Sequence, residues 1–241
     1  MKITKIMSDK GKQTDGYKIP TIAFLGDSVT QGCFEIYRNK EGGVGNIYDK
    51  NHTYHNYVAK ILSILFPATP INIINAGIAG SDAVSGEKRL ERDVLAFHPD
   101  LTVVCFALND SGEGIENVEK YIHALRNIFL RLKESGSEVI FMTPNMMNTE
   151  TSSFLKEELL KEIALSKQEI QNGGVLESYI EAAKKLCREC DVVVCDCYEK
   201  WKKLYESGVN VTELLANKIN HPTREMHWLF AGMLVNTMLE N

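Results

Sequence analysis

Short apolar runs rich in β-branched residues recur along this chain, and longer stretches of mixed polarity separate them. Five of these runs are expected to form strands: Thr21–Leu25, Ile71–Asn75, Leu101–Phe106, Glu138–Met142 and Asp191–Cys195. None of them alternates cleanly between apolar and polar residues, which is typical of strands that are covered on both faces.

The stretches between the runs carry the periodicity of amphipathic helices. Apolar residues fall on one stripe in His55–Leu65 and in Val118–Leu132, and Val175–Cys187 and Glu225–Leu239 predict two further helices. Alternation of strands with helices favours a parallel sheet that is covered by helices on both faces. The predicted fold class is therefore α/β, a three-layer α/β/α sandwich around a five-stranded parallel sheet.

Two longer stretches interrupt the alternation. Residues 33–53 are polar and glycine-containing, and residues 145–172 are expected to be helical in part, from Ser153 to Ile170. Long connections in compact domains are often lids or binding loops. Neither stretch resembles an interdomain linker, and no internal repeat is present. We therefore expect residues 1–241 to form one domain with these two inserts.

The composition narrows the possible partners and locations. A hydrophobic content of 44% and a charged content of 24% are typical of a soluble globular protein. The net charge of -5 gives no electrostatic case for binding nucleic acid or an anionic membrane. No apolar run approaches the ~20 residues that span a bilayer, and the first residues lack the apolar core of a signal peptide. We expect a cytoplasmic protein; its oligomeric state stays open.

The segment Gly26–Asp27–Ser28 ends the first predicted strand. Ligands bind beyond the carboxyl ends of the strands in open parallel sheets, so Ser28 lies where a site is expected. A hydroxyl at a helix start also lies near backbone N–H groups that can hold a developing oxyanion. The alternative is that Ser28 serves only as a helix N-cap.

Four short blocks, taken in chain order, make the chain resemble the SGNH hydrolases, also called the GDSL esterase and lipase family. They are Gly26–Ser28, Asn75–Gly80, Ala107–Asp110 (with alanine in place of the family's usual glycine) and His221–Pro222. Because the blocks run from position 26 to position 222, the resemblance covers nearly the whole chain. It implies the flavodoxin-like fold of that family and the cleavage of esters.

The resemblance also implies roles for individual residues. Ser28 would be the nucleophile and His221 the general base, with Asp27 in support. The oxyanion would be held by the backbone N–H groups of Ser28 and Gly80 and by the side-chain amide of Asn109. Glycine lets the backbone approach a substrate closely, and asparagine is a neutral donor. No metal or organic cofactor is implied.

His221 is chosen among six histidines because Pro222 and a predicted helix follow it, as in the last block of the family. The other five are expected to have structural roles: His52, His55, His98, His123 and His227.

The triad acid of the family lies three residues before the histidine, and Lys218 stands there in this chain. Lysine cannot accept the imidazole proton, so three alternatives remain open, of which we favour the first two together. A backbone carbonyl orients the ring in a Ser–His dyad, or a side-chain oxygen of Asn217 or Asn220 does so, or a distant carboxylate such as Glu213 or Asp196 approaches it. Loss of the acid from a triad costs several powers of ten in rate.

Two other interpretations are less favourable. The serine segment lacks the second glycine of the Gly-x-Ser-x-Gly elbow of α/β-hydrolases. The cysteines at 187, 190, 195 and 197 suggest zinc ligands as an alternative. The first two are expected at a helix end and the last two along a strand, so buried free thiols are the better interpretation.

The sequence thus predicts a serine esterase or acylhydrolase that cleaves small acyl esters, above all acetyl esters, through a covalent acyl-enzyme. The polar inserts favour a small-molecule acyl ester such as an acetylated sugar over a long-chain lipid. The alternatives are a non-catalytic ligand- or carbohydrate-binding member of the same fold and a thioesterase.

Overall fold

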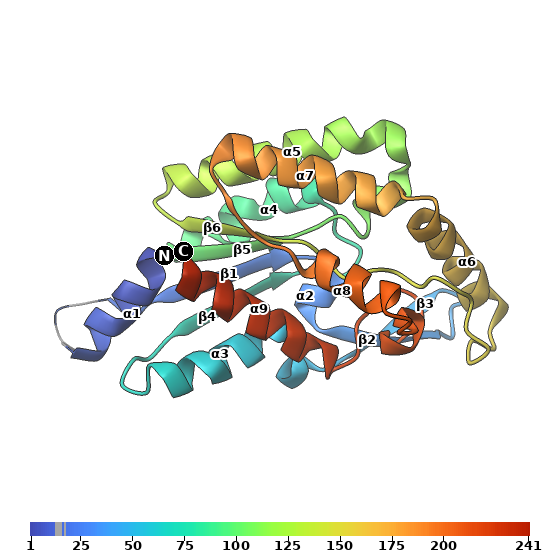
Figure 1. Ribbon diagram of the computed structural model, residues 1–241, viewed down its shortest axis with the longest axis horizontal. Helices are drawn as coiled ribbons and strands as arrows, with labels where there is room; N and C mark the ends of the chain where they lie inside the picture. The colour runs from blue at the N-terminus through green and yellow to red at the C-terminus, as the bar shows by residue number, and fades with distance from the viewer. Residues whose placement is uncertain (13–15, 17) are drawn as a thin grey trace.

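A five-stranded parallel sheet forms the centre of the computed structural model of the protein, which describes residues 1–12, 16 and 18–241 (Figure 1). Its strands lie in the order β4–β1–β5–β6–β7. They are β1 (Thr21–Gly26), β4 (Asn72–Gly77), β5 (Leu101–Cys105), β6 (Glu138–Met142) and β7 (Val193–Cys195). The sheet begins with β1; β4 pairs with it on one side, and β5, β6 and β7 follow in turn on the other. This is the flavodoxin-like order. The predicted sheet and fold class are confirmed.

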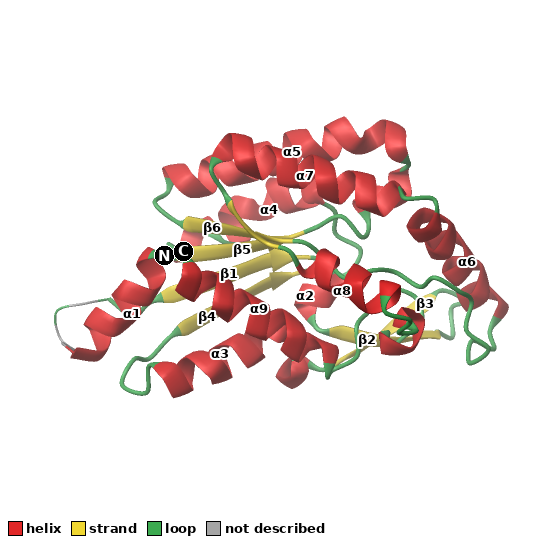
Figure 2. Cartoon of the chain, viewed as in Figure 1, coloured by secondary structure: helices red, strands yellow, loops and turns green. Residues whose placement is uncertain are grey.

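Helices cover both faces of the sheet (Figure 2). On one face lie α1 (Lys2–Lys12), α3 (Tyr54–Leu65) and α9 (Met226–Glu240). The other face is covered by α4 (Ala83–Asp93), α5 (Val118–Glu134) and α7 (Val175–Cys190). The remaining helices are α2 (Ser28–Gln31), α6 (Glu158–Asn172), α8 (Cys197–Glu206) and the short 3-10 helices η1 (Lys50–His52), η2 (Leu95–Phe97), η3 (Asp110–Glu113), η4 (Ile115–Asn117) and η5 (Val211–Leu214).

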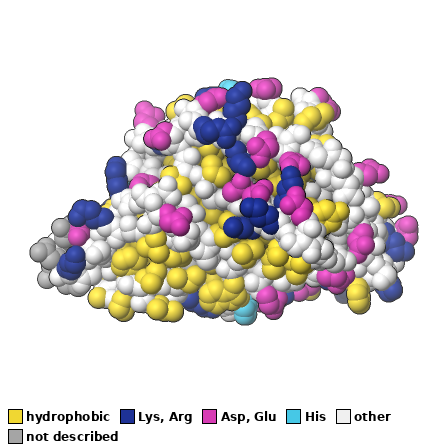
Figure 3. Space-filling model, in the orientation of Figure 1, with side chains coloured by type: hydrophobic (Ala, Val, Ile, Leu, Met, Phe, Trp, Pro, Cys, Tyr) yellow, Lys and Arg dark blue, Asp and Glu magenta, His cyan; other side chains and the backbone are white. Residues whose placement is uncertain are grey.

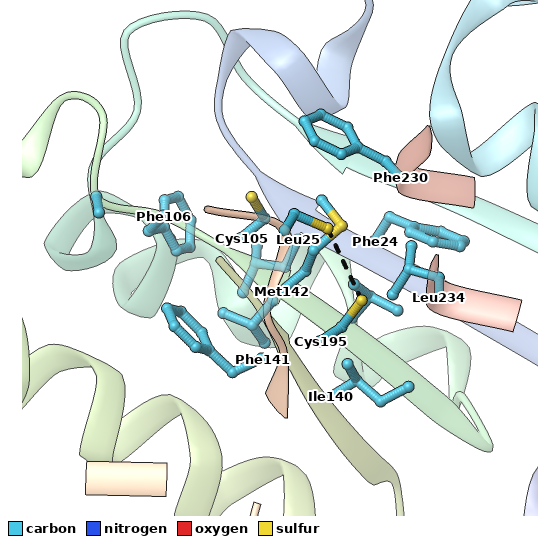
Figure 4. Packing of buried hydrophobic residues seen from close by; sticks show 14 of the residues in the cluster. Phe24, Leu25, Cys105, Phe106, Ile140, Phe141, Met142, Cys195, Phe230 and Leu234 are labelled. Atoms are coloured by element: carbon cyan, nitrogen blue, oxygen red, sulfur yellow. Dashed lines mark hydrogen bonds between the residues drawn. The ribbon is translucent and has the colours of Figure 1, made fainter. Parts of the chain in front are cut away.

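The central strands form the middle of the core, and the helices on both faces complete it. Every residue of β1 and β5 is buried, which explains why neither run alternates in polarity. Phe24 of β1 packs edge-on against Tyr54 of α3, and Phe141 of β6 packs edge-on against Phe129 of α5, with ring centroids 5.6 and 6.0 Å apart. Figure 4 shows both phenylalanines within the cluster of buried side chains. Each such fully buried side chain contributes about 1.5–3 kcal/mol of transfer free energy.

The insert at 33–53 forms an antiparallel hairpin of β2 (Cys33–Arg38) and β3 (Val44–Tyr48). The insert at 145–172 ends in α6, and both inserts lie beyond the carboxyl ends of the central strands (Figure 1). A small apolar cluster joins them to the segment that precedes His221: it contains Leu155, Leu160, Ala164 and Ile219, with Ile36 of β2 packed against it. The inserts therefore surround the end of the sheet where a site is expected.

The cysteine pattern differs in one detail from the prediction. Cys195 ends β7, but Cys197 begins α8, because the Asp196 carboxylate accepts the Glu199 N–H and so starts a helix between the two thiols. All six cysteines are free, and the Sγ atoms of Cys195 and Cys197 lie 3.8 Å apart. In the part of the chain that is described, no group of three or more His, Cys, Asp or Glu side chains is placed to hold a metal ion.

One face of the molecule is rich in hydrophobic side chains, which gather over α3 and α9 (Figure 3). Ile64, Leu65, Trp228 and Leu239 are exposed there, and the Trp228 ring stacks on Tyr57 with centroids 4.0 Å apart. None of the helices in the described ranges combines the length and apolarity needed to cross a membrane.

Candidate active site

Ser28 is the first residue of α2, directly after the carboxyl end of β1. The helix is capped by Asp27, whose Oδ1 accepts the Val29 N–H at 2.9 Å. Because the aspartate provides the cap, the Ser28 hydroxyl is available for another partner. Gly26 makes the turn possible, since a Cβ at that position would overlap the Thr30 side chain.

That partner is His221, whose Nε2 lies 2.9 Å from Ser28 Oγ. The other ring nitrogen, Nδ1, lies 3.1 Å from the backbone carbonyl of Phe34 in β2. A carbonyl can only accept, so Nδ1 carries the proton and Nε2 is left to accept the serine O–H. This is the tautomer that a general base requires.

The His221 ring is buried, and burial lowers its pKa from 6.5 to about 4. The Phe34 carbonyl and the charge of Glu35 both oppose this shift because they favour the protonated ring. At neutral pH the imidazole is therefore neutral and able to take the serine proton.

Asn217 shapes the loop before His221 rather than the ring itself. Its Oδ1 accepts the backbone N–H groups of Ile219, Asn220 and His221 at 2.9–3.0 Å, and its Nδ2 donates to Asn220 Oδ1. The His221 Nδ1 atom instead pairs with the Phe34 carbonyl, so the prediction that a side-chain oxygen of Asn217 or Asn220 orients the ring is wrong. The local reason is that three consecutive backbone N–H groups bond to the Asn217 oxygen and the Asn217 amide bonds to the Asn220 oxygen.

The carboxylates weighed as substitutes for the acid are also engaged elsewhere. Glu213 Oε2 lies 2.8 Å from the Nζ atom of Lys218, and Asp196 caps α8 and pairs with Lys184 at 2.7 Å. Of the three alternatives left open by the sequence, the structure shows the first, a backbone carbonyl. Phe34 could not be found from the sequence because its contribution is a main-chain atom.

Two of the three predicted oxyanion donors, Gly80 and Asn109, follow the strands that flank β1. Gly80 stands in the turn after β4 with a φ of +76°, in open space, and Asn109 follows β5. Asn109 Nδ2 donates one hydrogen to the Ser81 carbonyl at 2.9 Å, which leaves its second amide hydrogen for another acceptor. The structure thus places both residues at the end of the sheet that carries Ser28. Their role as donors stays a prediction.

Two buried carboxyl groups lie close to the serine turn. Burial raises the pKa of Asp27 to about 6 and that of Asp110 to about 7, and the positive charge of Lys167 in α6 lowers the Asp27 value in part. Asp110 Oδ1 accepts the Ala83 N–H at 2.8 Å and so fixes the start of α4. Both acids therefore have structural tasks beside the site.

None of the other five histidines lies in the serine turn. His227 and His55 are buried, and burial lowers the pKa of His227 to about 3 and that of His55 to about 4. His227 Nδ1 accepts the Tyr54 N–H at 2.9 Å, a packing role. His52, His98 and His123 are exposed.

The sequence profile of the GDSL-like Lipase/Acylhydrolase family matches residues 24–229, which include the serine turn and the His221 loop. The chain belongs to this family. The prediction of an SGNH-type, GDSL-like ester hydrolase is thereby confirmed as a family assignment.

Among known proteins, this GDSL-family chain is similar to an acetylxylan esterase of Geobacillus stearothermophilus, with 28% identity over 132 residues. The match covers 51% of this chain and 58% of the relative, so the chain spans less than two thirds of the length of that protein.

Solved structures share the fold at lower identity. Axe2, an acetylxylan esterase from Geobacillus stearothermophilus, superposes with a TM-score of 0.65 at 20% identity, over 90% of this chain and 93% of that one. BT4096, a gut microbial diltiazem-metabolizing enzyme, superposes with a TM-score of 0.67 at 19% identity, over 91% of this chain and 47% of that one. Catalytic variants of Axe2 have been solved in which a serine, a histidine or an aspartate is replaced by alanine.

Proposed function

We propose that this protein is a carboxylic ester hydrolase that removes small acyl groups, above all acetyl groups, from a carbohydrate through an acyl-enzyme on Ser28. The observation that carries the proposal is the pairing of Ser28 Oγ with the acceptor nitrogen of His221 at 2.9 Å, with the opposite nitrogen held by a carbonyl. A binding module without catalysis has no need of this tautomer.

In the proposed reaction Ser28 Oγ attacks the ester carbonyl carbon while its proton moves to His221 Nε2. The carbonyl oxygen becomes an oxyanion, which the N–H groups of Ser28 and Gly80 and the Asn109 amide stabilise; one such donor contributes about 3 kcal/mol. His221 then protonates the leaving alcohol as the C–O bond breaks. Water, deprotonated by the same nitrogen, releases the acid and restores the serine.

A groove of about 510 Å³ beside the His221 loop supports a carbohydrate as the leaving group. Both inserts and the residues just before His221 line it: Glu35–Arg38, Phe154–Glu157, Leu160 and Ala216–Lys218. Tyr37 and Phe154 are 49% and 72% exposed, and charged side chains surround them. Aromatic faces bordered by polar groups suit a hydroxylated ring. The similarity to an acetylxylan esterase supports the same class of substrate.

The test combines a covalent probe with a substrate series. Mass spectrometry after treatment with a fluorophosphonate should show one adduct on Ser28, which is absent in Ser28→Ala and present in a control variant at the solvent-facing Ser63→Ala. Turnover of p-nitrophenyl esters should fall as the acyl chain lengthens beyond acetyl, and acetylated xylooligosaccharides should release acetate. Absence of adduct and turnover, or preference for long acyl chains or for acetyl thioesters, would contradict the proposal.

A further inference from the structure

Arg224 lies three residues after His221 and is held by two carboxylates of the first insert. Its Nη1 and Nη2 atoms lie 2.6 and 3.1 Å from the two oxygens of Glu35, a bidentate pair. Its Nε lies 2.8 Å from Asp49 Oδ2. Two parallel N–H···O bonds to one carboxylate fix direction as well as distance, so this pair is geometrically specific.

The same guanidinium also contacts Phe34. It lies over the buried Phe34 ring, with its central carbon 4.4 Å from the ring centroid. The carbonyl that accepts from His221 Nδ1 belongs to the peptide bond between Phe34 and Glu35. Arg224 therefore holds the side chains at both ends of the peptide that orients the catalytic ring. We call Arg224, Glu35 and Asp49 the clamp.

Asp49 extends the clamp to the serine helix. Its backbone N–H donates to the carbonyl of Gly32, the residue that ends the helix starting at Ser28. Asp49 Oδ2 also lies 2.7 Å from His52 Nδ1. Through Arg224, the loop that carries His221 is tied to both ends of the hairpin and, one hydrogen bond further, to the helix that carries Ser28.

The charges of the clamp also act on the His221 ring. The Arg224 guanidinium keeps the pKa of Glu35 below its usual value and lowers that of Asp49 to about 2, so both carboxylates are charged at neutral pH. Two carboxylates and one guanidinium leave an excess negative charge, and Glu35 acts on His221 to favour the imidazolium. A triad acid has the same electrostatic effect on the ring.

We propose that Arg224 is a positioning residue of this active site: by holding Phe34 and Glu35, it sets the carbonyl that keeps His221 in its Nδ1-protonated form, a task that Lys218 cannot perform. The proposal rests on the proposed function in that Ser28 is taken as the nucleophile. Arg224 bonds to Glu35 and Asp49 and lies over Phe34, and its proposed effect passes through Phe34 to the imidazole.

The first test compares Arg224→Met with Arg126→Met, which removes a surface arginine paired to Glu189 at 2.6 Å. The measured quantity is the rate at which a fluorophosphonate modifies Ser28. Loss of a group that orients a metal-bound histidine typically costs about 10–100-fold; by analogy we expect a decrease of that order for Arg224→Met and no change for Arg126→Met. With p-nitrophenyl acetate, the loss should appear in kcat with KM nearly unchanged.

The second test reads the ring directly. Nitrogen-15 NMR of the histidines, with the His221 signals assigned by their absence in His221→Ala, should show one Nδ1-protonated tautomer in the wild type and a mixture in Arg224→Met. Arg224→Lys keeps the positive charge but cannot form the bidentate pair with Glu35, so its tautomer population should lie between those of the wild type and Arg224→Met. Glu35→Gln, which keeps the Phe34 contact, serves where Arg224→Met does not fold and should also give a mixture.

An unchanged tautomer together with an unchanged modification rate in these variants would overturn the proposal, even if their stability falls. An increase in KM alone would overturn it too, because it would assign Arg224 to substrate binding. If the wild type gains no adduct, the proposed function fails by itself, and the NMR comparison still decides the role of the clamp.

Discussion

Lys218 stands at the sequence position of the family's acid, and its side chain is paired with Glu213. Its Nζ donates to the Glu213 carboxylate, and its backbone has a φ of +57°. Lys218→Ala is therefore expected to leave kcat/KM for p-nitrophenyl acetate within about threefold of the wild-type value, whereas loss of a working triad acid costs about 10⁴-fold. His221→Ala is the matched control and should lose at least about 10³-fold. A 100-fold loss in Lys218→Ala would show that the lysine takes part in catalysis.

The lowered pKa of His221 predicts how the esterase activity depends on pH. Since the base works only when neutral and its pKa in the folded protein is about 4, kcat/KM should stay constant from pH 7 to about 5 and halve near pH 4. An unperturbed histidine would give that midpoint near 6.5. Initial rates measured from pH 3.5 to 8, with circular dichroism at each pH to exclude unfolding, distinguish the two. A midpoint above pH 6 would contradict the burial of the ring.

The packing of α2 on β4 leads to a prediction about elements. A Cβ at Gly77 would overlap the backbone of Gln31 in α2, the helix that begins with Ser28. Gly77→Ala should lower the free energy of unfolding by about 1–3 kcal/mol and reduce kcat by displacing the nucleophile. Gly232→Ala in α9 is the control, because a Cβ there meets no atom within 4 Å and should stabilise the helix by about 0.5–1 kcal/mol. Urea denaturation and esterase assays of both variants test this; equal stability of the two would refute it.

The groove between the two inserts leads to another prediction about elements, concerning Phe154. If Phe154 stacks on the sugar, Phe154→Ala should raise KM for an acetylated xylooligosaccharide about fivefold, equivalent to about 1 kcal/mol, and leave p-nitrophenyl acetate unaffected. Phe97→Ala, an equally simple loss of an exposed phenylalanine before the amino end of β5, is the control. Equal effects of Phe154→Ala on both substrates, or an effect of Phe97→Ala, would contradict a role of the groove in sugar binding.

The strands of the sheet were predictable because burial on both faces leaves continuous apolar runs, as in β1 and β5. Helices α1 and α4 were not predicted, since only Ile3, Met7 and Lys10 of α1 and Ala83, Gly86, Arg89 and Leu90 of α4 are buried, too few apolar positions to mark a stripe. The hairpin of β2 and β3 was not predicted because its two strands are short and lie within a stretch that is polar and glycine-containing as a whole. Ser28 and His221 could be predicted from short motifs, whereas the Phe34 carbonyl and Arg224 depend on how the hairpin packs.

The N-terminal helix belongs to the core of the whole molecule. Ile3 and Met7 are fully buried in the main cluster, and the N-terminal nitrogen lies 3.5 Å from the Met238 carbonyl of α9, so the two ends of the chain meet (Figure 1). Ile3→Ala should lower the free energy of unfolding by about 2–5 kcal/mol without changing kcat. Lys5→Ala, which removes a surface ion pair to Asp9, should cost less than about 0.5 kcal/mol. Urea denaturation separates these values; a cost below 1 kcal/mol for Ile3→Ala would mean that α1 unfolds independently.

The group that orients His221 is a main-chain carbonyl, and no amino-acid substitution removes a main-chain carbonyl. Replacement of Phe34 by any other amino acid leaves that oxygen in the chain and removes only the ring on which the Arg224 guanidinium lies. An alanine scan of this molecule is therefore expected to reveal the acceptor only through the side chains that hold its peptide, which are those of Arg224, Glu35 and Phe34. Substitution alters the support of the acceptor and never the acceptor itself.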